Sequence, residues 1–292
     1  MIPEWLEARQ LGEEAFEAAY AAALPQERAL VKTAIATLYT WLDPSDLLWM
    51  RSEAEKGQGL CLSTRSSPRN WAVVQIPAHC CDPGLVVGAV LPLLAAGVWP
   101  VIAFLEEEDP NRQEAILALE LSGVETVYIL PSTMMEHALK QWMRGDANGP
   151  GIVVSIDPGT ILSCGQENNA SGGHMLVKLP RPQKAGVWLQ EQDIDLWALS
   201  FMHPGLDCGV WSEVERELPP GFRSICGQWF DFLQQRLDVV WVPRSLMNQA
   251  LNTFSLVLGP GQEPVWIWPW YVSSLAGHIR LAVAQGQKPE SV

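Results

Sequence analysis

Four short apolar runs, separated by three segments of helical character, organise this chain. The runs cover residues 71–76, 98–104, 124–130 and 152–156. Continuous apolar runs are typical of parallel strands whose two faces are both covered by helices. The repeated order of strand, helix and strand implies right-handed crossovers within one sheet. The pattern therefore predicts an α/β fold that is Rossmann-like, with an open and mostly parallel sheet.

The segments between the runs carry residues that begin helices. Residues 84–96 follow Asp82 and Pro83 and are apolar on every side, which predicts a helix that is buried all round. Thr133 and Glu136 have the spacing of a capping box, so another helix is expected to begin there. These helices are the expected crossovers between the strands.

Outside this region the pattern predicts two flanking parts. Residues 1–56 are expected to form an N-terminal helical layer on the Rossmann-like core of residues 57–160. Residues 161–292 form a C-terminal α/β extension, which either adds to the first sheet or makes a second, smaller lobe. Its expected elements are an antiparallel pair at 175–179 and 186–190, strands at 239–242 and 265–268, and helices at 246–258 and 273–284.

Charge and composition narrow the class of partner. The 292 residues carry a formal net charge of −14. This argues against nucleic acid or an anionic membrane surface, because binding there needs clustered Lys and Arg. The chain has no run of about 18 apolar residues, so no transmembrane helix is predicted. Six cysteines are too few for a disulfide framework in a chain of this length, so a cytoplasmic protein with reduced thiols is expected.

The loop at residues 77–83 is the best candidate for a site. It follows the first strand and leads into a helix N-terminus, where ligands bind in open α/β sheets. His79, Cys80 and Cys81 are the candidate catalytic residues, because a thiolate there would be stabilised by the helix dipole. Pro77 and Asp82 would contact a cofactor. The alternative is that the two cysteines are small buried apolar residues and that Asp82 only caps the helix.

Two acidic residues after the second strand are the other candidates for cofactor binding. Glu106 and Glu107 stand where a dinucleotide site places an acid against the ribose hydroxyls. The alternative is a solvated acidic loop. No metal site is predicted, since the spacings of His79, Cys80, His174 and His203 match no metal signature.

Tryptophan is unusually frequent, with 14 residues. Most are scattered along the chain, which favours packing in the core and at interfaces over a single aromatic site. Trp266 and Trp268 alternate with other residues in an expected strand, so they would share one face. That face is predicted to pack in the core or at a subunit interface.

Residues 71–143 resemble the nucleotide-binding half of the aldehyde dehydrogenase and histidinol dehydrogenase superfamily. The similar features are a strand that ends in a proline loop, Asp82-Pro83 before an apolar helix, and a Pro-x-x-Ala-Ala-Gly run at residues 92–97. The resemblance implies a Rossmann-like fold and NAD as the cofactor. One departure is the acidic stretch at residues 105–109, where aldehyde dehydrogenases carry a lysine.

Two functions follow as hypotheses. The first is a diverged NAD(P)-dependent dehydrogenase-like protein that binds a nucleotide or a small anionic ligand at the carboxyl edge of the sheet. The second is a non-catalytic structural or regulatory subunit that kept the scaffold and lost the chemistry. The first has a small molecule as its partner. The second has another subunit, or a second copy of the chain in a homodimer.

Overall fold

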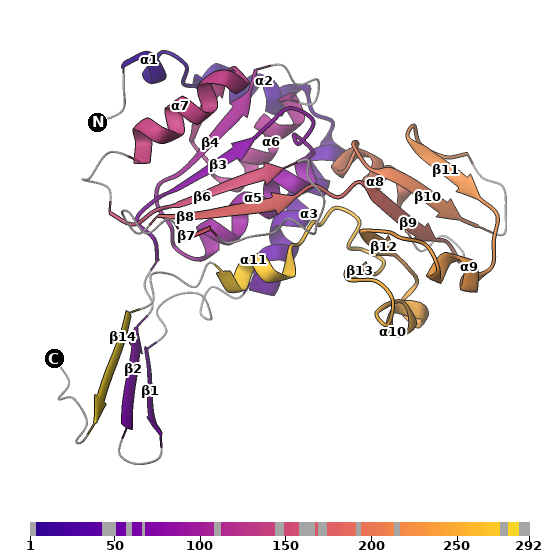
Figure 1. Cartoon of the computed structure of the whole chain (residues 1–292). Coiled ribbons are helices and arrows are strands. Elements are labelled where there is room, and N and C mark those ends of the chain that lie inside the picture. Colours follow the sequence, from indigo (N-terminus) through magenta and orange to yellow (C-terminus); the bar gives the residue numbers. More distant parts are fainter. Residues whose placement is uncertain are drawn as a thin grey trace.

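The computed structural model describes residues 4–42, 51–56, 60–65, 68–107, 112–143, 149–157, 167–168, 174–190, 194–212, 217–274 and 280–285. Two mostly parallel sheets and one small antiparallel sheet make up its strands (Figure 1). Helices flank both large sheets. The predicted Rossmann-like α/β class is therefore confirmed.

The first sheet contains all four of the predicted strands. From one edge to the other its order is β5 (Thr126–Leu130), β4 (Val101–Glu106), β3 (Ala72–Ile76), β6 (Ile152–Asp157), β8 (Met175–Pro180) and β7 (Glu167–Asn168). The first five strands run parallel, and β7 pairs antiparallel with β8. The strand order reverses between β3 and β6, and such a switch point is where open α/β sheets bind ligands.

The second sheet is made by the C-terminal half of the chain. Its five parallel strands are β11 (Phe222–Ile225), β10 (Asp207–Trp211), β9 (Lys184–Trp188), β12 (Val239–Trp241) and β13 (Val257–Leu258). The expected antiparallel pair at 175–179 and 186–190 is wrong, because β8 joins the first sheet and β9 the second. Residues 181–183 are the link between the two sheets, and the amides of Gln183 and Lys184 are held by the carboxylate of Asp238.

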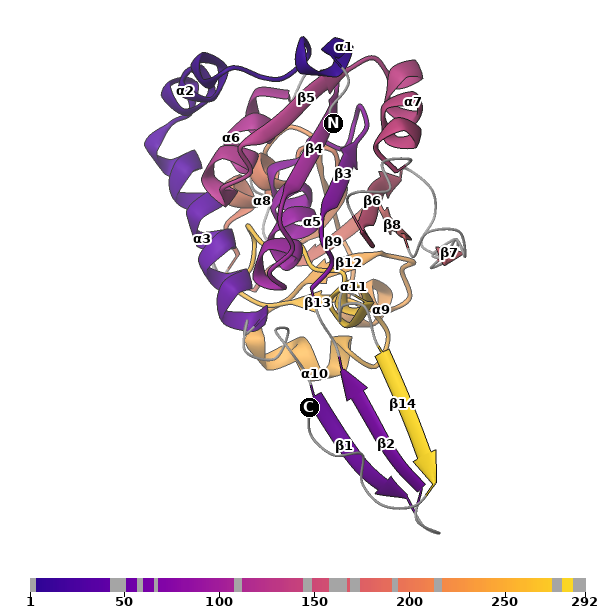
Figure 2. The same ribbon diagram turned by 90° about the vertical axis from the view of Figure 1, so that its left-hand side faces the viewer.

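Three further expectations for the C-terminal part are also wrong. The expected helix at 246–258 is helical only in part, as α10 (Met247–Ala250), and its last residues form the strand β13. Residues 265–268 form no strand. The expected helix at 273–284 is instead α11 (Pro269–Ser274) and, further on, the strand β14 (Arg280–Gln285). β14 pairs with β2 (Leu60–Arg65), which also pairs with β1 (Arg51–Lys56). These three antiparallel strands project from the rest of the molecule in both views (Figures 1 and 2). No helix in the described ranges is long and apolar enough to cross a bilayer.

Helices cover the two faces of the first sheet unequally. One face packs against α5 (Pro83–Ala95) and α6 (Arg112–Ser122), with α2 (Glu13–Ala22) and α3 (Pro25–Leu42) as an outer layer. The other face packs against α7 (Ser132–Met143) and the short α1 (Glu4–Glu7). Figure 2 shows α7 on the other side of the first sheet from α3 and α6.

Helix α5 is the structural centre, because it lies between the first sheet and the second part of the chain. Twelve of its 13 residues are buried. Two glycines let the second part approach. A Cβ at Gly84 would lie 2.2 Å from His203 Cε1, and one at Gly88 would lie 2.7 Å from the carbonyl oxygen of Trp266. The hydroxyl of Tyr271 donates to the carbonyl of Ala89 at 2.9 Å.

Trp266 and Trp268 belong to this contact. Both are 4% exposed, and their rings meet edge to face with centroids 5.9 Å apart. The indole N–H of Trp268 donates to the carbonyl of Pro180 at 3.0 Å. Of the two packing roles predicted for these tryptophans, core packing is the one that the structure confirms.

Candidate functional site

The thiols of the predicted catalytic loop lie inside the protein. Cys80 and Cys81 have no exposed surface and belong to the main apolar core. His79, just before them, is exposed and has a left-handed backbone with φ of 68°. This geometry favours the alternative in which the two cysteines are small core residues.

Asp82 is held by an ion pair. Its carboxylate is 1% exposed and lies 3.3 Å from Nη2 of Arg181, which directly follows β8. Although Asp82 stands at the N-cap of α5, its side chain makes no capping hydrogen bond. Gly205 leaves room for the guanidinium, since a Cβ there would overlap Nη2 of Arg181. The pair therefore ties the start of α5 to the link between the two sheets.

The two acidic candidates also make contacts within the protein. Glu106 accepts the backbone N–H of Ala78 at 2.6 Å, so it holds the loop against the end of β4. Glu107 is exposed, and its carboxylate lies 3.7 Å from Arg9. A ribose contact by either residue stays a prediction.

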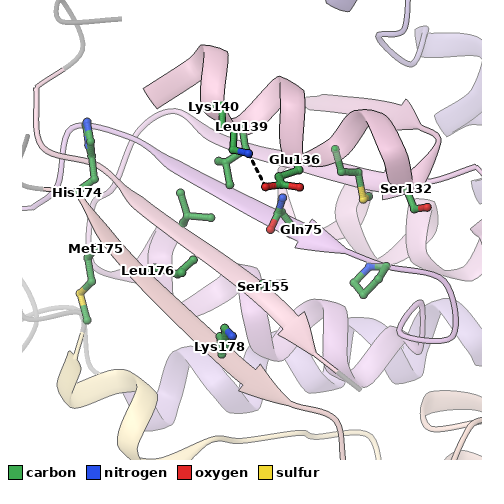
Figure 3. A pocket seen from close by; sticks show the side chains of 13 residues that line it. Gln75, Ser132, Glu136, Leu139, Lys140, Ser155, His174, Met175, Leu176 and Lys178 are labelled. Carbon is green, nitrogen blue, oxygen red and sulfur yellow. Dashed lines mark hydrogen bonds and ion pairs between the residues drawn. The ribbon is translucent and has the colours of Figure 1, made fainter. Parts of the chain in front are cut away.

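A pocket of about 570 Å³ lies on the α7 side of the first sheet. Its floor is formed by β3, β6 and β8, and α7 forms one wall (Figure 3). Of the predicted site residues, only Pro77 lines it. Among the described residues, the lining is made up of Gln75, Pro77, Ser132, Met135, Glu136, Leu139, Lys140, Val153, Ser155, His174, Met175, Leu176 and Lys178.

A row of three polar side chains crosses the pocket floor. Gln75 of β3 is in register with Ser155 of β6, and Ser155 is in register with Lys178 of β8. All three are partly exposed. Residues in register on neighbouring parallel strands point to the same face, about 4.8 Å apart from strand to strand. The row therefore places an amide, a hydroxyl and an ammonium group side by side.

Under α7 the same row continues with aromatic residues. Gln75 is also in register with Phe104 of β4, and Phe104 with Tyr128 of β5. The two rings are fully buried and meet edge to face at 5.8 Å, and Met135 and Ala138 of α7 belong to the same cluster. One half of this sheet face is thus closed by α7, and the polar half is open.

The wall and the end of the pocket add two charged residues and one histidine. Glu136 and Lys140 of α7 form an i,i+4 ion pair at 2.5 Å, and this hydrogen bond lowers the pKa of Glu136. At the other end, Nδ1 of His174 accepts the N–H of Gly151 at 3.2 Å. A neutral ring with that contact carries its proton on Nε2, which makes Nε2 a donor.

The Glu-His dipeptide at 136–137 does not form a joint site. His137 directly follows Glu136 in the sequence. Here Glu136 lines the pocket, whereas the ring of His137 lies 5.7 Å from that of Trp5. Only the glutamate contributes to the pocket.

His203, which was considered for a metal site, and the thiol of Cys208 are both buried in the core. His203 is 1% exposed and bonds through Nε2 to the carbonyl of Glu263 at 3.0 Å, and burial lowers its pKa to about 4. Burial raises the pKa of Cys208 to about 12. In the described ranges no three His, Cys, Asp or Glu side chains come together as a metal site.

The polar row was not predicted, although the sequence contains a signal for it. Gln75, Ser155 and Lys178 are each the fourth residue of their strand. Each interrupts an otherwise apolar run at the same distance from the strand start. In parallel strands that share a register, such polar positions must meet. A pattern that counts each run as uniformly apolar does not reveal that these polar positions meet.

Comparison with known proteins supports the fold. No family model and no curated protein matches the sequence. The solved structure of histidinol dehydrogenase from Elizabethkingia anophelis is similar over 96% of this chain and 77% of its own, with 11% identity and a TM-score of 0.57. An aldehyde dehydrogenase variant from Bacillus cereus is similar over 94% and 83%, with 9% identity and a TM-score of 0.48. The resemblance predicted from residues 71–143 is confirmed for the fold, and the chain has a dehydrogenase-like scaffold.

Proposed function

We propose that this protein binds a small anionic ligand in the pocket on the α7 side of the first sheet. The observation that carries the proposal is the row of Gln75, Ser155 and Lys178. A cavity of a few hundred Å³ with apolar walls and a few convergent polar groups is the usual form of a small-molecule site. The row also lies near the carboxyl ends of its strands, beside the switch point of the sheet.

Two classes of ligand fit this proposal. The family resemblance implies a nucleotide, with NAD as the first candidate. The donors of Gln75, Ser155 and Lys178 suit the oxygens of a phosphate or a ribose. When bound, NAD would supply a hydride acceptor, and these three residues would hold it. The other class is a smaller organic anion, which needs fewer contacts.

The burial of three of the four cysteines in the described ranges favours binding without thiol chemistry. Cys80 and Cys81 are inaccessible, and the raised pKa of Cys208 keeps that thiol protonated. Cys226 is exposed but does not line the pocket. The second candidate function, a non-catalytic subunit that kept the scaffold, draws support from this. A homodimer that buries Trp266 and Trp268 does not, because both are already covered within one chain.

Hydrogen exchange tests whether the pocket is a binding site. The full chain is exchanged with and without NAD, NADH or hexanoate at saturating concentration. We expect at least one of them to slow exchange in β3, β6, β8 and α7, since a bound ligand stabilises the state that binds it. The variant Lys178→Met should weaken the effect. Lys32→Met, on the exposed side of α3, is the matched control and should leave it unchanged. Equal exchange with and without all three probes would refute the proposal.

A further inference from the structure

We infer that the pocket takes an amphipathic monocarboxylate, with its carboxylate between Lys178 and Ser155 and its apolar part between α7 and the sheet. This inference rests on the proposed function and narrows it to one class of ligand. It is drawn from the charges, the donors and the apolar side chains of the pocket (Figure 3).

The charge of the described lining residues favours an anion. Among them are two lysines, Lys140 and Lys178, and one acid, Glu136, so their formal charges sum to +1. The whole chain carries −14, so this positive patch is a local exception. The Glu136–Lys140 pair lies on the α7 wall, whereas Lys178 lies on the floor. A ligand with two negative charges would bring an excess charge into a pocket that also contains Glu136, and like charges repel.

The donors of the floor are arranged for a carboxylate at one end. The hydroxyl of Ser155 lies one strand away from Lys178, so the ammonium and the hydroxyl can each donate to one carboxylate oxygen. Among the described residues, neither Ser155 nor Gln75 has a hydrogen bond from its side chain to the protein. Gln75 stands two strands from Lys178, at about 10 Å, and its amide can bind a polar substituent there.

The apolar part of the ligand has a defined place. Val153 and Leu176 are in register with each other, and each lies two residues before a member of the polar row, on the same face. Met135 and Leu139 of α7 line the pocket opposite this apolar floor. An alkyl or aromatic group attached to the carboxylate can extend over Val153 and Leu176 in the direction of His174.

Calorimetry with three matched probes tests the inference on the full chain. Hexanoate is the anion, hexanamide its neutral isostere, and hexyl phosphate the anion of higher charge. We expect hexanoate to bind about tenfold or more tightly than hexanamide, since a hydrogen bond between charged groups is worth roughly this ratio. Lys178→Met should remove the difference, Lys178→Arg should restore most of it, and Lys32→Met should not change it. Circular dichroism melts show whether each variant is folded.

The outcomes separate the inference from the proposal beneath it. Equal binding of hexanoate and hexanamide, or a preference for hexanoate that survives Lys178→Met, overturns the inference but not the proposed function. Tighter binding of hexyl phosphate or NAD at the same residues also overturns it, in favour of a phosphate ligand. Failure of every probe to bind, or to slow hydrogen exchange at β3, β6 and β8, overturns both.

Discussion

The two faces of the first sheet are built from the same strands, but helices cover them to different extents. Alternate residues of β3 point to opposite sides, so Ala72, Val74 and Ile76 meet α5 and α6, whereas Val73 and Gln75 point to the α7 side. On the first face the described strand residues are buried. On the second, α7 packs over β4 and β5, whereas Gln75, Ser155 and Lys178 are partly exposed. A change of one residue along the strand thus decides whether a side chain builds the core or the pocket.

The covered face also holds the two halves of the chain together. Helix α5 is buried by the sheet on one side and by His203 and Trp266 on the other. The residue at its N-cap, Asp82, forms the ion pair with Arg181. The Asp82–Arg181 pair on this side is largely buried, whereas the polar groups of the pocket floor are partly exposed. The comparison indicates that the covered face contributes most to stability, whereas binding at the other face is our proposal.

The largest effect is expected where the ion pair is broken. Arg181→Met removes the cation beside a carboxylate that is 1% exposed. Loss of one member of a buried pair costs about 3–5 kcal/mol, because a buried charge loses its counter-charge. The free energy of unfolding, measured by urea denaturation, should fall by this amount. The double variant Asp82→Asn with Arg181→Met should recover part of it. A loss below about 1 kcal/mol would show that the pair contributes little.

How much of this could be predicted from sequence depends on the same two faces. The apolar runs predicted the strands of the first sheet and the buried helix α5, because burial on both sides leaves a continuous apolar signal. They did not predict that β8 belongs to the first sheet and β9 to the second, since the partner of a strand is a long-range choice. The loop at residues 77–83 was singled out for its residue types, but these do not reveal that Cys80 and Cys81 lie in the main apolar core.

The next largest effect is the dependence of stability on pH that His203 causes. Its pKa is lowered by burial to about 4, against 6.5 for an ordinary histidine. Between these values the unfolded chain binds a proton that the folded chain does not, so stability falls as the pH is lowered from 6.5 towards 4. This group alone should contribute about 3 kcal/mol across the window. The glutamine variant His203→Gln can still donate to the carbonyl of Glu263.

Urea denaturation at several pH values checks this. In His203→Gln the dependence of stability on pH between 4 and 6.5 should be weaker than in the unmodified chain by about the amount given above. His137→Gln, at an exposed position on α7, is the matched control and should keep the original dependence. Parallel pH profiles for the unmodified chain and His203→Gln would refute the assignment to His203.

The smallest effect is expected on the open face, and there the prediction is the absence of a change in stability. Gln75→Leu removes an amide that is partly exposed and has no hydrogen bond to the described residues. Substitutions of this kind usually change the free energy of unfolding by no more than about 0.5 kcal/mol. Leucine suits a strand, and the neighbouring Val73 and Phe104 are apolar. A slight gain in the free energy of unfolding would therefore also agree with this prediction. A loss above 1 kcal/mol, measured by urea denaturation, would mean that Gln75 supports the fold. The proposed difference between a stabilising face and a binding face would then be wrong at Gln75.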